Sequence, residues 1–303
     1  FSLFPLVTVM NLSSAQDTLF AGTFALLILN IMKMMENKRL RPVWILFFIY
    51  LIIYFVICLG LRNQQFLWLE LACFSMIISI YILFKNRMPK KKNIIISLIF
   101  ALIYLVSDIF QFNIFSVFHG ILVFLSCSAS FSVFEKYKEH SLCFVRNEKK
   151  TDILLSIIIG IICGIVWGGI NYFLMIGSNP LVPTNVFKAL LVALNPAVIE
   201  EISCRCIFFA FCLYIAGGEI KRGAQSFTVW FMMIVPHILP HILFNTTTGI
   251  IESIVSFLIS LVLYIVVFGY LFAFLQRKRD IMSAMIAHGV VDWIRFCIFG
   301  LPF

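Results

Sequence analysis

Long apolar segments separated by short polar connectors are the feature that most constrains how this chain can fold. We identify ten of them, each close to or above the length of a helix that crosses a bilayer. The predicted spans are residues 18–35, 43–60, 66–84, 94–110, 113–134, 153–176, 186–215, 226–244, 250–275 and 281–300. They lack the alternation of apolar and polar residues that is typical of a membrane barrel. The sequence therefore predicts an all-α, polytopic transmembrane helical bundle of about ten spans.

The composition excludes a water-soluble protein. The chain is 62% hydrophobic and 12% charged, whereas a soluble domain is about 45–50% apolar and about 25% charged. The net charge of +9 raises the question of nucleic-acid binding, but the basic residues lie in short runs between the apolar segments. Such runs orient a membrane protein. We therefore expect a lipid bilayer, and no nucleic acid, as a partner.

The connectors alternate in charge along the chain. Nearly all Lys and Arg lie in the connectors at 36–41, 85–92, 135–152, 217–224 and 276–280. The intervening connectors, at 61–65, 111–112, 177–185 and 245–249, are short and nearly neutral. By the positive-inside rule, the basic set is predicted to be cytoplasmic.

The most polar connector, at 135–152, divides the chain into two parts. We interpret residues 1–134 as N-terminal transmembrane helices of unassigned role. They contain few ionisable side chains at membrane depth, and we interpret Asp108 and His119 among these as packing or interfacial groups. Residues 153–303 form the domain in which polar side chains gather within the predicted spans.

The seventh predicted span carries three ionisable residues within six positions: Glu200, Glu201 and Arg205. A charge at the centre of a membrane helix costs about 2.5–3.5 kcal/mol on insertion scales, so this cluster indicates a function. Glu201 and Arg205 are four residues apart, on one helical face, and suit an ion pair. Glu200 lies about 100° round the helix, where it is free to point elsewhere and to act as a general base.

Two later spans carry the other polar clusters. His237 and His241 would share a face of a regular helix, although a proline before each of them predicts a kink. His288 and Asp292 are again four residues apart, so the carboxylate can orient the imidazole. On the predicted orientation the clusters lie from mid-membrane towards the cytoplasmic side, and we expect them to converge in one cavity.

These clusters resemble the motifs of the CPBP (Abi) family of intramembrane proteases, which includes the type II CAAX prenyl endopeptidases. The family motifs are EExxxR, FxxxH and HxxxN or HxxxD, and here EExxxR stands at 200–205 and HxxxD at 288–292. For the second motif we choose His237, which has Met233 where the motif has Phe, and we keep His241 as an auxiliary candidate. The resemblance covers roughly residues 150–300.

The resemblance implies an intramembrane endopeptidase of the glutamate type that needs no cofactor. Glu200 and His237 would activate a water that attacks the scissile carbonyl of a peptide or membrane-protein substrate. His288 and Asp292 would bind the developing oxyanion. Glu201 and Arg205, the other two residues of the first motif, belong to the same predicted site.

Three alternatives stay open. Glu200, His237 and His241 could bind zinc, although this HxxxH lacks the internal Glu of HExxH, which favours catalysis without a metal. The same polar cavity could serve a non-catalytic immunity or regulatory protein that binds a peptide or partner without cutting it. A proton- or metal-coupled transporter would also need buried charges, but the two halves show no internal repeat.

The residue usage, rich in Lys, Ile, Asn and Phe, indicates an AT-rich genome. We therefore expect a multi-pass protein of a bacterial cell membrane. Roles within the family include the maturation of secreted peptides and self-immunity to a bacteriocin. The sequence specifies no oligomeric state.

Overall fold

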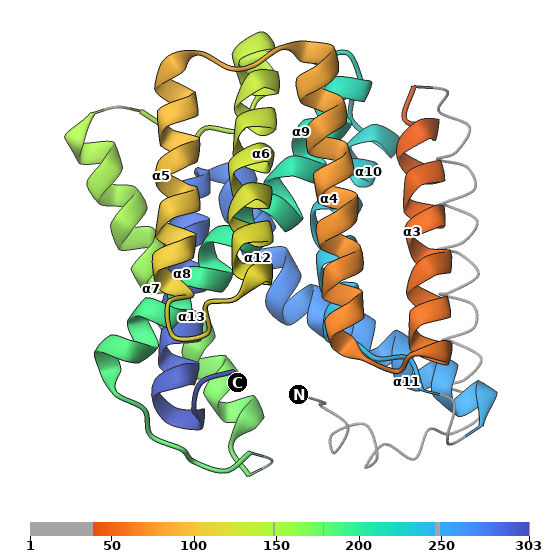
Figure 1. Cartoon of the computed structure of the whole chain (residues 1–303), viewed down its shortest axis with the longest axis vertical. Helices are drawn as coiled ribbons and strands as arrows, with labels where there is room; N and C mark the ends of the chain where they lie inside the picture. Colours follow the sequence, from red (N-terminus) through yellow and green to blue (C-terminus); the bar gives the residue numbers. More distant parts are fainter. Residues whose placement is uncertain (1–38, 148, 178, 246–248, 303) are drawn as a thin grey trace.

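The computed structural model describes residues 39–147, 149–177, 179–245 and 249–302, and these form a bundle of helices with no strand among them (Figure 1). The all-α prediction is therefore confirmed for this part of the chain. The longer helices are α3 (Arg41–Gly60), α4 (Gln64–Asn86), α5 (Lys91–Ser107), α6 (Ile114–Lys136), α7 (Lys150–Met175), α8 (Val186–Glu201), α9 (Ile207–Ile215), α10 (Ala224–Ile238), α11 (Ile250–Tyr264), α12 (Tyr270–Lys278) and α13 (Ile281–Phe299). Short turns of 3-10 helix lie at Lys138–His140 and Leu239–His241, and π-helical turns lie at Ile202–Cys206 and Ile265–Gly269.

Six helices of the described chain are long and apolar enough to cross a membrane, which supports a multi-pass membrane protein but not the predicted count of about ten spans. They are α3, α4, α6, α7, the continuous segment Ile250–Lys278 and α13. The predicted span at 18–35 lies outside the described residues. The remaining predicted spans are helical but shorter: α5 has 17 residues, α10 has 15, and the segment 186–215 is interrupted by its π-helical turn.

Polar residues fix where several helices begin. Asn63, Asn113 and Asn185 precede α4, α6 and α8, and each side chain accepts a hydrogen bond from a backbone N–H of the first turn. Asp280 does the same for α13, through the backbone N–H of Ser283. These caps bond N–H groups that have no partner within the helix.

A row of glycines brings α7 and α13 into close contact. Gly160, Gly164 and Gly168 recur every four residues, so they lie on one face of α7. A methyl group at Gly164 would lie only 2.6 Å from the Cβ atom of Val290 on α13. Small residues at this spacing let two membrane helices approach closely. The glycines therefore set the position of α13, which carries the third motif.

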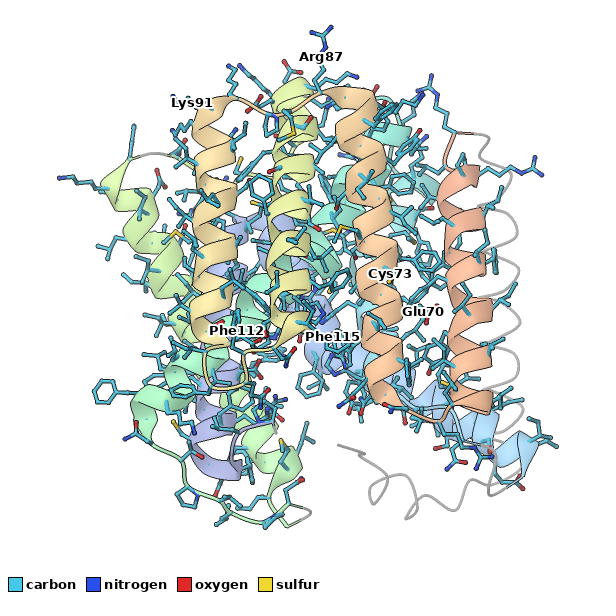
Figure 2. All side chains as sticks on the ribbon, in the orientation of Figure 1. Glu70, Cys73, Arg87, Lys91, Phe112 and Phe115 are labelled. Atoms are coloured by element: carbon cyan, nitrogen blue, oxygen red, sulfur yellow. The ribbon has the colours of Figure 1, made fainter. Side chains whose placement is uncertain are left out.

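The two ends of the bundle differ in charge. Figure 2 shows Arg87 and Lys91 at one end, which we call the basic end, and Phe112 and Phe115 at the other, which we call the far end. The basic end holds the connectors that follow α4, α6, α9 and α12, whereas the far end holds those that follow α3, α5 and α7. The charge alternation of the sequence therefore corresponds to two separate faces.

Candidate functional site

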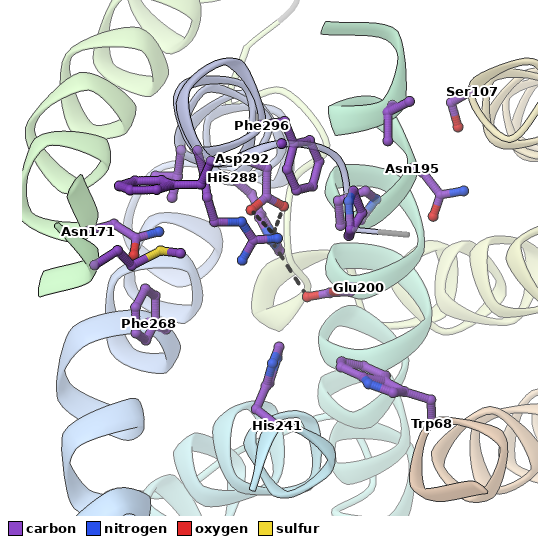
Figure 3. A pocket seen from close by; sticks show the side chains of 18 of the residues that line it. Trp68, Ser107, Asn171, Asn195, Glu200, His241, Phe268, His288, Asp292 and Phe296 are labelled. Carbon is purple, nitrogen blue, oxygen red and sulfur yellow. Dashed lines mark ion pairs between the residues drawn. The ribbon is translucent and has the colours of Figure 1, made fainter. Parts of the chain in front are cut away.

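Polar residues from each of the three motifs converge in one cavity of about 480 Å³. Glu200, His237, His241, His288 and Asp292 all line it, from α8, α10 with its 3-10 turn, and α13 (Figure 3). The predicted convergence is confirmed. The cavity extends from these residues to the far end of the bundle, because several of its other lining residues, such as Gln65, Gln111 and Asn179, come from far-end segments.

Glu201 and Arg205 form the predicted ion pair, and both side chains are fully buried. The π-helical turn begins directly after Glu201 and includes Arg205. Gln276 of α12 donates from Nε2 to Glu201, at 2.7 Å to the carboxylate and 3.0 Å to the backbone oxygen. The pair does not line the cavity but lies behind it. The ion pair can therefore affect the site only through the side chains that it contacts.

Glu200 stays out of this ion pair, as the helical spacing predicts, but it has a partner of its own. Its Oε2 atom lies 2.6 Å from Nε2 of His237. On the other side of the same ring, Nη2 of Arg205 lies 2.6 Å from Nδ1. A guanidinium only donates, so Nδ1 must accept and the proton of His237 is on Nε2. His237 therefore donates to Glu200.

His288 connects the buried ion pair to the cavity. Its Nδ1 donates to Oε1 of Glu201 across 2.7 Å, and its ring stacks on Phe272 with 4.6 Å between centroids. Its Nε2 lies 3.4 Å from Oδ2 of Asp292 and 3.6 Å from Oε2 of Glu200. One face of the ring is thus held by packing, and Nε2 is aimed between two carboxylates of the cavity wall.

Asp292 has two cationic or hydrogen-bonding neighbours. Besides His288, the guanidinium of Arg295 lies 3.4 Å from its Oδ1 atom. Both residues line the cavity, and Arg295 is the more exposed of the two. The i,i+4 contact between His288 and Asp292 that the sequence predicts is present.

His241 lies beyond the end of α10, because the helix tightens into a 3-10 turn after Ile238. Pro236 lies inside α10 and Pro240 lies in the 3-10 turn, so the departure from a regular α-helix comes at the second proline. The His241 ring lies edge-on to His237, with centroids 5.4 Å apart, and contacts Trp68 and Tyr264. One ligand atom each from Glu200, His237 and His241 lies within 4.8 Å of the others. The alternative zinc ligands proposed from the sequence do come together.

The structure adds residues to which the sequence assigned no role in the site. Gln276, which donates to Glu201, lies in the predicted basic connector at 276–280, so its position in the sequence did not indicate a role in the site. Asp108, interpreted from the sequence as a packing group, lines the cavity and accepts a hydrogen bond from Asn195 across 3.1 Å. Phe272 supports the ring of His288, and no polar signal marks it.

A family model matches part of the chain. Residues 182–294 match the model described as "Type II CAAX prenyl endopeptidase Rce1-like". This segment contains both EExxxR at 200–205 and HxxxD at 288–292, together with His237 and His241 between them. No curated protein and no solved structure matches the chain.

Proposed function

We infer that this chain is an intramembrane endopeptidase, from the match of residues 182–294 to the Rce1-like model of type II CAAX prenyl endopeptidases. The residue usage of the sequence favours a bacterial cell membrane as its location. It hydrolyses a peptide bond in a peptide or a membrane-associated protein. The observation that carries this proposal is the juxtaposition of Glu200 and His237 on one wall of a cavity with His288 on another. A carboxylate, an oriented imidazole and a second hydrogen-bond donor are the groups that hydrolysis by a bound water requires.

Glu200 is the general base in this proposal. Oε2 accepts a hydrogen bond from His237, which leaves Oε1 to take a proton from water. The resulting hydroxide attacks the scissile carbonyl, and the carbonyl π electrons move to its oxygen. When the C–N bond breaks, the proton held by Glu200 passes to the leaving amine. Glu201 and Arg205 act as positioning residues, because Arg205 holds the ring of His237.

His288 is the donor to the oxyanion. With a proton on both nitrogens, its Nδ1 donates to Glu201 while Nε2 donates into the cavity. Asp292 lies beside Nε2 and orients it. We assign the orienting role to Asp292 because it lies against both Arg295 and His288, and a second negative group cannot itself stabilise an oxyanion.

We favour catalysis without a metal over the zinc alternative. Glu200, His237 and His241 have the chemistry of a zinc site and lie close enough together. A metal on Nε2 of His237 would require the proton to move to Nδ1, and Nδ1 faces a donor from Arg205. Two donors would then face each other across 2.6 Å. The hydrogen bonds of His237 therefore fit a proton on Nε2 and not a metal ion.

Comparative peptidomics tests this function. Cells producing the wild type, Glu200→Gln or the control Glu219→Gln are compared for peptides and new protein termini in membranes and medium. Glu219 is an exposed carboxylate in the connector between α9 and α10, away from the cavity. We expect products with the wild type and Glu219→Gln, and none with Glu200→Gln at an equal membrane level. Identical profiles for all three would contradict the endopeptidase and favour a protein that binds without cutting.

A further inference from the structure

The basic connectors are joined to one another at a single end of the bundle. The backbone N–H of Lys90, before α5, donates to the carboxylate of Glu135 at the end of α6. The backbone N–H of Ile281, at the start of α13, donates to the carbonyl of Cys143 in the 137–149 connector. These bonds join segments far apart in the sequence at the basic end, where Figure 2 shows Arg87 and Lys91.

The cavity that contains the catalytic residues opens at the opposite face. Its outer wall comes from far-end segments, including Gln65 in the first turn of α4, Gln111 between α5 and α6, Asn179 between α7 and α8, and Gly300 after α13. Within the described chain, no basic connector contributes a lining residue.

The path from the cavity to the basic end is closed. Glu200 lies near the middle of the helical segment 186–215, and residues 201–213, which continue from it towards the basic end, are all buried. The Glu201–Arg205 ion pair lies behind the cavity wall on this side, and both of its side chains are fully buried. Water and substrate can therefore reach Glu200 from the far end and not from the basic end.

Basic connectors face the cytoplasm in multi-pass membrane proteins. We propose that the catalytic cavity opens to the extracytoplasmic side of the membrane, so that its substrate is an exported peptide or an outward-facing segment of a membrane protein. The assignment of a substrate rests on the proposed function, whereas the direction in which the cavity opens does not.

The lining of the outer cavity fits a peptide backbone. The amide side chains of Gln65, Gln111, Asn171, Asn179 and Asn195 line it. Each amide group offers both a donor and an acceptor, as the backbone of an extended peptide does. A peptide backbone can form hydrogen bonds with such amide groups, whereas an acyl or prenyl chain cannot. These amides therefore favour a peptide segment over a lipid chain as the occupant.

Cysteine accessibility in intact cells tests the direction of opening and needs no proteolysis. Native Cys143 is exposed and reports on the basic end. Gln65→Cys, at the mouth of the cavity, and Asn195→Cys, deeper on the same helix as Glu200, are made in a Cys143→Ser background. Cells are treated with a small membrane-impermeant, anionic thiol reagent before or after permeabilisation. The Cys143→Ser chain without an added cysteine gives the background from the other thiols.

We expect both added cysteines to react in intact cells to the same extent as in permeabilised cells, and Cys143 of the parent chain to react only after permeabilisation. Reaction of Cys143 in intact cells would overturn the orientation. Reaction of Gln65→Cys but not of Asn195→Cys in intact cells would overturn the route to the catalytic residues. Since the readout is labelling, the proposal can stand or fall whether or not the peptidomic comparison finds a product.

Discussion

Arg205 bonds two different catalytic motifs with one side chain: its Nη1 pairs with Glu201, four residues earlier, and its Nη2 lies 2.6 Å from Nδ1 of His237 on another helix. The planar guanidinium presents several donors in a fixed arrangement, which an ammonium group does not. The ion pair therefore neutralises a buried carboxylate and also fixes which nitrogen of His237 carries the proton. This relationship leads to two predictions about catalysis.

Replacing Arg205 by Lys should reduce turnover of the substrate found by peptidomics by roughly 10²-fold. Lysine keeps a positive charge for Glu201 but cannot hold Glu201 and His237 together, so the ring loses its orientation. Arg279→Lys is the matched control, because Arg279 pairs with Asp152 and Asp280 outside the cavity. Full turnover by Arg205→Lys would show that His237 does not need this hydrogen bond.

His237 and His241 should differ in importance. We expect His237→Ala to lose on the order of 10²–10⁴-fold in turnover, as for a group engaged in proton transfer. His241→Ala should keep most of its activity, since His241 contacts the rings of Trp68 and Tyr264 and does not hydrogen bond Glu200.

The turnover of the two histidine variants is compared with that of the wild type. The zinc content of the purified protein is measured as well, together with its turnover before and after treatment with a chelator. Catalysis without a metal predicts no stoichiometric zinc and no loss on chelation. Equal loss in the two histidine variants, together with inactivation by the chelator and restoration by zinc, would instead support the three-ligand zinc site.

The local parts of the site could be predicted from sequence because helix geometry fixes them. Residues four apart on a helix are neighbours, which predicts the contacts of Glu201 with Arg205 and of His288 with Asp292. The contact of His288 with Glu201 joins residues 87 positions apart, and that of Gln276 with Glu201 joins residues 75 apart. Such contacts depend on how helices pack, which spacing within one segment does not determine.

The differences between the predicted and the observed fold have a similar origin. The apolar run at 186–215 predicts one uninterrupted span, but Pro196 supplies no N–H to the helix and a π-helical turn follows at Ile202–Cys206. Hydropathy measures only how apolar a segment is, so it detects neither feature. It also could not show which end of the cavity is closed, because that depends on the burial of residues 201–213 by other helices.

We expect Glu201 to stabilise the fold and Glu200 to serve catalysis. Glu201→Gln leaves the buried guanidinium of Arg205 without a carboxylate, and breaking a buried ion pair in this way costs about 3–5 kcal/mol of unfolding free energy. Glu200→Gln should change stability little, because the amide oxygen still accepts the hydrogen bond from His237. Thermal unfolding of both variants in the same detergent checks this. Equal unfolding midpoints would mean that the Glu201–Arg205 pair does not stabilise the fold.

Gly164, in the glycine row of α7, should matter for stability, whereas Gly169 beside the row should not. A Cβ atom at Gly164 would lie 2.6 Å from Cβ of Val290 and 2.9 Å from the carbonyl oxygen of Ala287, whereas nothing lies within 4 Å of one at Gly169. Gly164→Ala should therefore cost about 1–3 kcal/mol through overpacking. It should also lower turnover, because α13 carries His288 and Asp292.

Gly169→Ala is the matched control, and alanine at an open helical position should leave stability unchanged or raise it by up to about 1 kcal/mol. Thermal unfolding and turnover of the two variants are compared in the same detergent. Adding Val290→Ala to Gly164→Ala removes the closest atoms and should restore part of the lost stability. If Gly164→Ala is as stable and as active as Gly169→Ala, the close approach of α7 and α13 is not what positions His288 against Glu201.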